Sequence, residues 1–97
     1  MKVRFTRPAF ADLEAIHSFI TGQSGNAVVA SRVILRLVER SRALDDMPLL
    51  GRETDEPGVR VLIVPRLRFL IFYVVEDDTV FITHVRHASR DRPKWVV

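Results

Sequence analysis

The C-terminal segment of the chain holds the side chains that are best suited to chemistry. It reads Arg86-His87-Ala88-Ser89-Arg90-Asp91-Arg92-Pro93-Lys94-Trp95. In one interpretation, its arginines clamp a phosphate while His87 moves a proton, as in a metal-free ribonuclease. In a second, the segment is a docking surface for DNA, for an enzyme that acts on nucleic acid, or for an acidic peptide. The third interpretation is a solvated chain end without a function.

Arginines from neighbouring predicted strands extend this basic segment. We expect Arg60, Arg66 and Arg68 to converge with it. The predicted target-binding residues are Arg60, Arg68, Arg86, Arg90, Arg92, Lys94 and Trp95. For Trp95, an anchor against the domain is favoured over an exposed contact. The net charge of +3 and the predominance of arginine over lysine indicate a polyanionic partner, either nucleic acid or an acidic protein.

Several classes of site and location are disfavoured by composition. There is no cysteine, and the three histidines show no HExxH spacing, so we expect no disulfide, metal or other cofactor. Ser89 lies two residues after His87, but local spacing alone is weak evidence for a catalytic nucleophile beside its base. The longest apolar run, Phe69–Val75, is far shorter than the roughly 18 residues of a membrane span. We therefore expect a cytoplasmic protein with no membrane association.

Two stretches have the three- and four-residue spacing of helices that are buried on one face. The first follows the capping residue Thr6, and its predicted buried face is Phe10, Leu13, Ile16, His17 and Ile20. Gly22 and Gly25 bracket a break. The second helix is capped by Asn26 and ended by Pro48. Its predicted apolar stripe is Ala30, Val33, Ile34, Leu37, Val38, Leu44 and Met47, with Arg32, Arg36 and Arg40 on another face.

The remaining segments alternate or are continuously apolar, as strands are. Residues 2–6 form a short first strand, and residues 48–58 form a loop. Three strands follow, at Val59–Val64, Arg68–Val75 and Thr79–His87, the last two joined by a tight acidic turn. The order β-α-α-β-β-β predicts a single α+β domain over residues 1–97. It has two layers, a helical hairpin packed on one face of a mainly antiparallel sheet.

Over almost its whole length the chain resembles the RelE/ParE superfamily of type II toxin–antitoxin systems. The matching segments are Val3–Thr6, Ala11–Ile16, Pro48–Arg52, Gly58–Val64, Ile71–Val75 and Val80–His87, followed by Arg90. Each segment is short, but their order and spacing together are fairly specific. The resemblance implies the same β-α-α-β-β-β fold.

The resemblance also implies a partner and a target. It implies a toxin encoded beside a cognate antitoxin, which neutralises it in a hetero-oligomer by laying an extended or helical segment across its surface. ParE-like members poison DNA gyrase and are not known to need a catalytic residue. RelE-like members cut messenger RNA on the ribosome. For the RelE-like case, the resemblance assigns catalysis to His87 and Arg90.

Departures from the ribonuclease pattern favour the ParE-like branch. RelE-like nucleases carry an arginine three residues before the tyrosine that matches Tyr73, and this chain has Leu70 there. The tyrosine that they often carry near the C-terminus is missing, although Trp95 lies nearby, and lysines are scarce. We therefore expect a non-enzymatic inhibitor of DNA gyrase, with a ribosome-dependent messenger RNA endoribonuclease as the alternative.

Overall fold

Two helices begin at side chains that cap their first turns. In the computed structural model, which describes residues 1–89, they are α1, Arg7–Ser24, and α2, Ala27–Arg42. Thr6 and Asn26 each accept a hydrogen bond from a backbone N–H of the following turn. Gly25 ends α1 with a φ of 67°, a left-handed conformation that suits glycine. The helices therefore fold back on each other as the predicted hairpin.

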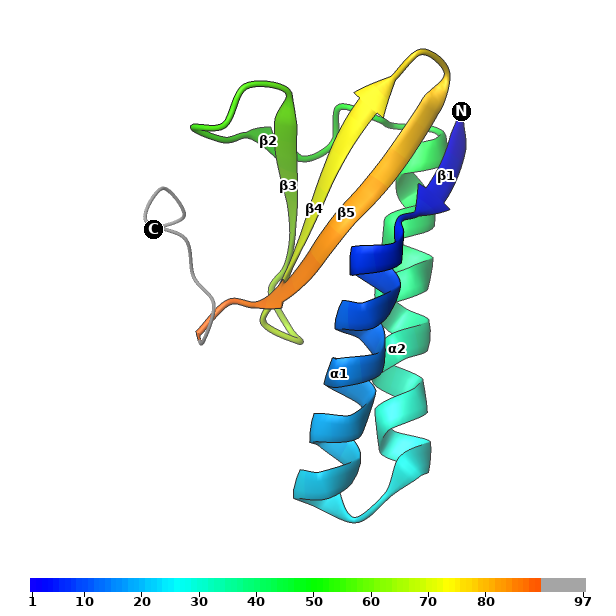
Figure 1. Cartoon of the computed structure of the whole chain (residues 1–97), viewed down its shortest axis with the longest axis vertical. Coiled ribbons are helices and arrows are strands. Elements are labelled where there is room, and N and C mark those ends of the chain that lie inside the picture. Colours follow the sequence, from blue (N-terminus) through cyan, green and yellow to red (C-terminus); the bar gives the residue numbers. More distant parts are fainter. Residues whose placement is uncertain (90–97) are drawn as a thin grey trace.

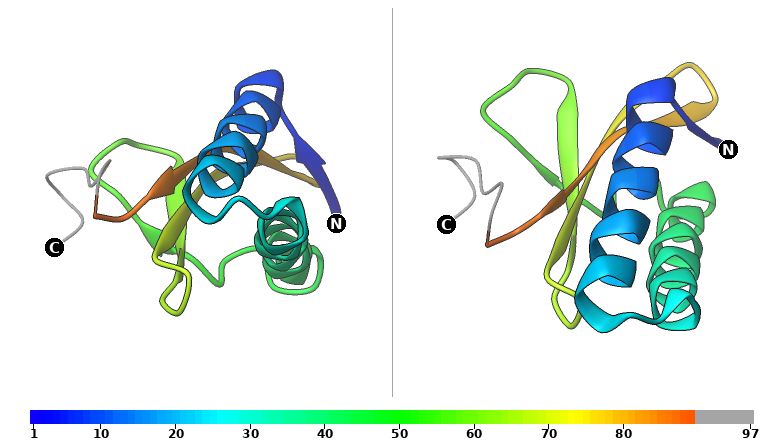
Figure 2. Two further views of the ribbon diagram at one scale, coloured as in Figure 1. Left: turned by 90° about the horizontal axis from the view of Figure 1, so that it is seen from below. Right: turned by 60° about the horizontal axis from the view of Figure 1, so that its bottom comes forward.

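The strands form one five-stranded sheet in the order β1-β5-β4-β3-β2. Their bounds are β1 Lys2–Phe5, β2 Arg52–Glu53, β3 Val59–Val64, β4 Phe69–Glu76 and β5 Thr79–His87. Neighbouring strands are antiparallel except β1, which runs parallel to β5. Both helices lie on one side of this sheet, and the joint between them projects beyond it (Figures 1 and 2). The predicted two-layer α+β fold is confirmed.

The main core lies between the hairpin and the sheet because apolar side chains of both layers meet there. Its buried members are Ala9, Leu13, Ile16, Leu37, Leu44, Leu62, Phe69, Ile71, Tyr73, Val80, Ile82 and Val85. Side chains of a strand alternate between faces, so Leu70 and Phe72 of β4 point the other way from Ile71 and Tyr73. Together with Val61 they form a second, smaller buried cluster on the opposite face of the sheet.

Two predicted boundaries are wrong. Residues 48–58 contain β2, which pairs with β3 through Arg52↔Val61 and Glu53↔Arg60. Both β2 residues are exposed and polar, so the strand comes from backbone pairing and leaves no hydrophobic pattern. The second helix ends at Arg42 rather than at Pro48, and a 3₁₀ turn, Ala43–Asp45, follows it.

Two residues predicted to be buried are exposed. Phe10 retains 56% of its surface because the buried face of α1 is centred on Ala9, Leu13 and Ile16. Its ring instead lies 5.9 Å from that of Phe5. Met47 is also 56% exposed, since it lies beyond the end of α2.

Candidate target-binding surface

Strand β5 continues past its neighbour β1, and this extension presents Arg86 and His87. β1 pairs with β5 only as far as Phe5↔Ile82. Thr6 then continues the pairing, because its backbone N–H and its hydroxyl both donate to the carbonyl of Ile82, at 3.0 and 2.9 Å. The start of α1 thereby replaces β1 along the edge of β5.

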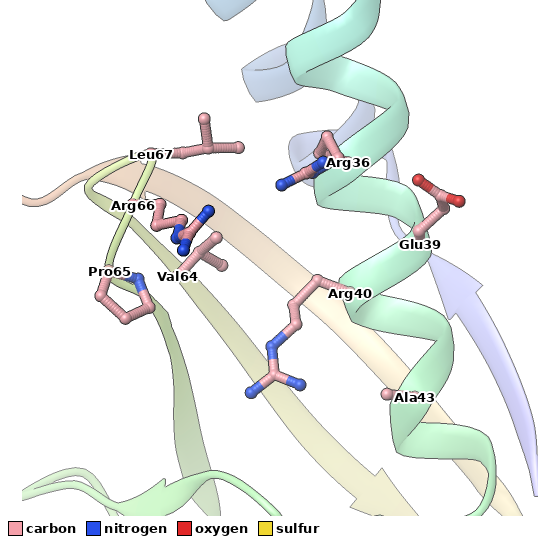
Figure 3. A pocket seen from close by; sticks show the side chains of 8 residues that line it. All are labelled: Arg36, Glu39, Arg40, Ala43, Val64, Pro65, Arg66 and Leu67. Atoms are coloured by element: carbon pink, nitrogen blue, oxygen red, sulfur yellow. The ribbon is translucent and has the colours of Figure 1, made fainter.

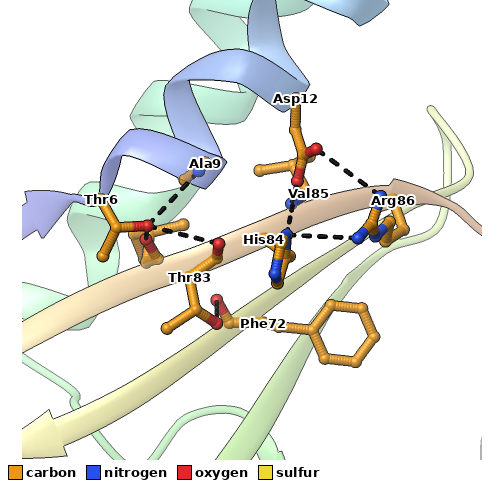
Figure 4. A network of polar contacts seen from close by, with 9 residues as sticks. Thr6, Ala9, Asp12, Phe72, Thr83, His84, Val85 and Arg86 are labelled. Atoms are coloured by element: carbon orange, nitrogen blue, oxygen red, sulfur yellow. Dashed lines mark hydrogen bonds and ion pairs between the residues drawn. The ribbon is translucent and has the colours of Figure 1, made fainter.

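Further along the same edge of β5, the side chain of Asp12 from α1 takes the place of a pairing strand (Figure 4). Its Oδ2 accepts a hydrogen bond of 2.9 Å from the backbone N–H of Val85, which is itself buried. The same carboxylate lies 3.0 Å from Nδ1 of His84 and 3.6 Å from Nη1 of Arg86. Asp12 is only 16% exposed, so its charge is partly shielded from water. It thus fixes the guanidinium of Arg86 over the end of the sheet.

The tautomer of His84 follows from these contacts. Its Nδ1 is 3.0 Å from Asp12 and 3.3 Å from Nη2 of Arg86. An ionised carboxylate can only accept, so Nδ1 carries the hydrogen that Asp12 receives. Nδ1 then cannot also accept from Arg86, and that approach is a close contact rather than a hydrogen bond. His84 therefore donates to Asp12 and helps to orient it, although the His84 side chain itself is 41% exposed.

A groove of about 340 Å³ runs between α1 and this end of β5. Its lining is Asp12, Ala15, Ile16, Phe19, Val85, Arg86 and His87. One wall is mainly apolar and comes from α1, and the other carries the basic side chains of β5. Such a groove suits a segment that has apolar and acidic side chains on adjacent faces.

His87 is held by local contacts. Its ring meets that of Phe69 edge to face, with centroids 5.2 Å apart. Its Nδ1 accepts from the backbone N–H of Ser89 at 3.3 Å, and the Ser89 hydroxyl lies 2.9 Å away. These contacts position the imidazole at the end of β5. Its predicted catalytic partner, Arg90, lies outside the described residues.

Only part of the predicted target-binding set can be placed. Arg68, Arg86 and His87 come together, since Leu70 pairs with Arg86, and Ala88 donates a 2.7 Å hydrogen bond to the carbonyl of Arg68. Arg90, Arg92, Lys94 and Trp95 lie outside the residues that the structure describes. The expected convergence of Arg60 with this group is wrong, because Arg60 lies near the start of β3 whereas Arg68 follows the far end of that strand.

Arg60 makes contacts within the fold instead. Its Nη1 donates a 2.6 Å hydrogen bond to the carbonyl of Gly51, and its Nη2 lies 4.0 Å from Glu53. The backbone N–H of Gly51 donates at 2.8 Å to the hydroxyl of Tyr73. Burial raises the pKa of this phenol above 10.0, and the Gly51 hydrogen bond and the Arg60 charge oppose the rise. Arg60 and Tyr73 thus hold the loop that leads into β2.

The side chain of Gly51 must be a hydrogen atom. A Cβ at this position would lie 2.7 Å from the Tyr73 ring and 2.7 Å from the carbonyl oxygen of Val61. No sequence pattern indicates this close approach, nor the reach of Asp12 to β5, because both join residues far apart in the chain. Gly51 nevertheless belongs to the segment Pro48–Arg52, which carries part of the family resemblance. The close approach of Tyr73 and Val61 explains why this position is glycine.

Two kinds of feature are absent from residues 1–89. No group of three histidine, cysteine, aspartate or glutamate side chains among these residues is arranged to hold a metal ion. Neither helix in this part of the chain has the length and hydropathy needed to cross a membrane.

The comparisons with known proteins agree with this geometry. A family model described as the ParE toxin of the type II toxin–antitoxin system parDE matches residues 3–92. A structure of the chromosomal ParDE system from P. aeruginosa is 28% identical, with a TM-score of 0.83 over 90% of this chain and 95% of that one. No curated protein sequence matches the chain.

Two E. coli structures share the fold at lower identity. The isolated RelE toxin is 17% identical, with a TM-score of 0.56 over 93% of this chain and 86% of that one. The RelBE toxin–antitoxin complex is also 17% identical, with a TM-score of 0.57 over 92% and 98% of the two chains. The match over residues 3–92 places this chain in the ParE toxin family of type II toxin–antitoxin systems, on the ParE side of the RelE/ParE superfamily.

Proposed function

We propose that this protein is a toxin that inhibits DNA gyrase and that a cognate antitoxin neutralises it. The match of the ParE toxin model to residues 3–92 carries this proposal. The similar P. aeruginosa structure is described as a ParDE system and one E. coli structure as a toxin–antitoxin complex. Inhibition then depends on surface contacts, and the protein performs no chemical step on its target.

The position of Leu70 supports gyrase over messenger RNA as the target. RelE-like nucleases have an arginine at the matching position of the central strand. Leu70 is 1% exposed and packs with Val61 and Phe72 in the second buried cluster. A guanidinium would be costly to bury there without a partner, so this strand is built for packing rather than for binding phosphate.

A supercoiling assay tests the target. Purified protein, added to gyrase, ATP and relaxed plasmid, is expected to suppress supercoiling and to accumulate cleaved plasmid. Protein premixed with its antitoxin is the control and should leave supercoiling intact. In cells, expression should induce the DNA-damage response while messenger RNA stays whole.

Primer extension on messenger RNA from expressing cells examines the alternative. Ribosome-dependent cuts that disappear in His87→Ala or Arg90→Ala would establish the RelE-like activity and overturn our proposal. A general acid or base contributes about a hundred- to ten-thousand-fold to a rate, so the loss would be unmistakable.

The groove between α1 and β5 is our proposed seat for the antitoxin. Ile16, Phe19 and Val85 offer it an apolar surface, and Arg86 offers a positive charge that Asp12 holds in place. An amphipathic acidic segment would cover this surface and match its charge.

Two phenylalanines of α1 provide a matched pair of variants for this seat. Phe19 lines the groove and is 45% exposed, whereas Phe10 is 56% exposed and lies outside the groove lining. Phe19→Glu should weaken antitoxin binding by about tenfold or more, because it removes an aromatic contact and repels an acidic segment. Phe10→Glu should change the affinity by less than about twofold. Calorimetry measures the affinity of each variant for the antitoxin. Equal effects of the two changes would show that the antitoxin binds elsewhere.

A further inference from the structure

Helix α2 carries a row of arginines that the target-binding surface does not use. Arg32, Arg36 and Arg40 are four residues apart and all exposed. Side chains at this spacing share one face of a helix, with Cβ atoms about 5–6 Å apart. The row therefore extends along about 12 Å of the helix, at 1.5 Å per residue.

A fourth arginine faces this row across a groove of about 580 Å³. The groove is lined by Arg36, Glu39, Arg40, Ala43, Val64, Pro65, Arg66 and Leu67. In Figure 3 the guanidinium groups of Arg36 and Arg40 extend from α2 and that of Arg66 from the β3–β4 turn, into the same space. Two elements that are distant in sequence thus direct positive charge to one place.

The turn that carries Arg66 is well defined. The backbone N–H of Arg68 donates a 3.2 Å hydrogen bond to the carbonyl of Pro65, which closes the turn. The ring of Pro65 fixes its φ angle, so the backbone at this position has little freedom to lose when a partner binds. Arg66 is therefore presented from a fixed backbone, and a partner would have to order only its side chain.

Within residues 1–89, no ion pair neutralises the positive charge of the groove. The ion pairs within residues 1–89 involve Met1–Asp45, Arg60–Glu53 and the contacts of Asp12, so none includes Arg36, Arg40 or Arg66. Glu39 is the one acidic residue in the lining, and Figure 3 shows its carboxylate directed away from the groove. A polyanion would relieve the repulsion among the arginines.

We propose that this groove and the arginine row bind the phosphate backbone of duplex DNA without sequence preference. Duplex DNA has one charge per about 1.7 Å of its axis, so about seven phosphate charges lie along 12 Å. Val64 and Leu67 also line the groove, so its charged groups lie beside a small apolar surface. The site goes beyond gyrase inhibition, which does not require it, and adds a contact to DNA itself.

The lining argues against other polyanions. Single-stranded nucleic acid is gripped by aromatic side chains on which bases stack, and no aromatic residue lines this groove. An acidic peptide would need a deep apolar pocket to anchor it, whereas this groove is open. Arginines at regular intervals along a straight helix suit a regular line of phosphates better than either.

A salt titration of DNA binding tests the proposal. The full chain is mixed with a fluorescent duplex, and anisotropy is measured at rising salt. Replacing Arg36, Arg40 and Arg66 together by glutamine should weaken binding by about tenfold or more. The slope of log affinity against log salt should become shallower by about 0.9 for each phosphate that the variant no longer neutralises.

The control triple replaces Arg4, Arg7 and Arg52 by glutamine, which removes the same charge from exposed sites outside the groove. It should keep most of the affinity and slope. Equal losses in the two triples would overturn the proposal, because net charge alone would then explain binding. Stronger binding of polyglutamate or of single-stranded RNA than of duplex DNA would overturn it as well.

A lysine triple at the same three positions guards against misfolding. Lysine keeps the charge and binds phosphate as a point charge, whereas carboxylate recognition by arginine uses its planar fork. The lysine protein should retain affinity for the duplex within about threefold. A loss as large as that of the glutamine triple, in a folded protein, would contradict phosphate binding.

Discussion

At the scale of single residues, Tyr73 joins the sheet to the loop that precedes β2. Its side chain is fully buried, and its hydroxyl accepts the N–H of Gly51. The phenol is neutral in the fold, because burial raises its pKa above 10.0. Ionisation at high pH would place a charge in the core. The stability that the neutral phenol contributes is therefore present below pH 10 and lost as pH rises above it.

Tyr73→Phe should lower the free energy of unfolding at pH 7 by about 1–2 kcal/mol, because the N–H of Gly51 loses its acceptor. The same change should make unfolding less sensitive to pH above about 10, since no phenol remains to ionise. Urea unfolding of both proteins at pH 7 and at rising alkaline pH measures the two effects. Parallel declines of the two proteins at alkaline pH would show that other groups cause the loss.

At the scale of the element, α1 rather than another strand covers the part of the β5 edge that β1 leaves unpaired. Asp12 contributes most here, because it accepts from Val85 and faces Arg86. Asp12→Ala leaves the buried N–H of Val85 without an acceptor and should cost about 1–3 kcal/mol of stability. Asp12→Asn keeps an acceptor and should cost less. Urea unfolding measures the free energy of unfolding of both variants. Equal losses in Asp12→Ala and Asp12→Asn would show that the charge of Asp12, and not its hydrogen bond to Val85, causes the effect.

The elements differ in how far the sequence predicts them. β3, β4 and β5 are predictable because their alternation or continuous hydrophobicity is a local signal. β2 is not, because its pairing depends on β3 and its own residues are exposed. The predicted burial of Phe10 is wrong because helical periodicity locates an apolar face only to about one position. The contact of Asp12 with Val85 joins positions 73 residues apart, which no local pattern records.

At the scale of the whole molecule, the proposed antitoxin groove and the predicted target-binding segment share Arg86 and His87. The antitoxin seat is proposed along α1 and β5, and the basic C-terminal segment is predicted to contact the target. Residues 92–97 belong to that segment, with Arg92, Lys94 and Trp95 in it. None of these three is among the residues that line the antitoxin groove. We therefore expect that changes in residues 92–97 alter toxicity without altering neutralisation.

Deleting residues 92–97 should reduce toxicity more than antitoxin binding. We expect growth arrest to require about tenfold more protein, equivalent to about 1.4 kcal/mol in target binding. The affinity for the antitoxin should change by less than about threefold. A growth assay and calorimetry on the truncated protein measure the two. Unchanged killing would identify the segment as a solvated chain end.

The parallel pairing of β1 with β5 sets the order in which a newly synthesised chain can complete its sheet. Lys2 pairs with Thr79, so the partners are 77 positions apart in the sequence (79 − 2). At about 5–20 residues per second, the ribosome needs about 4–15 s to make that stretch. The helical hairpin can form during this interval, but β1 has no strand beside it until β5 emerges. Until β5 has been made, the sheet lacks this pairing, so the helical hairpin is the first part of the fold that a binding partner can meet.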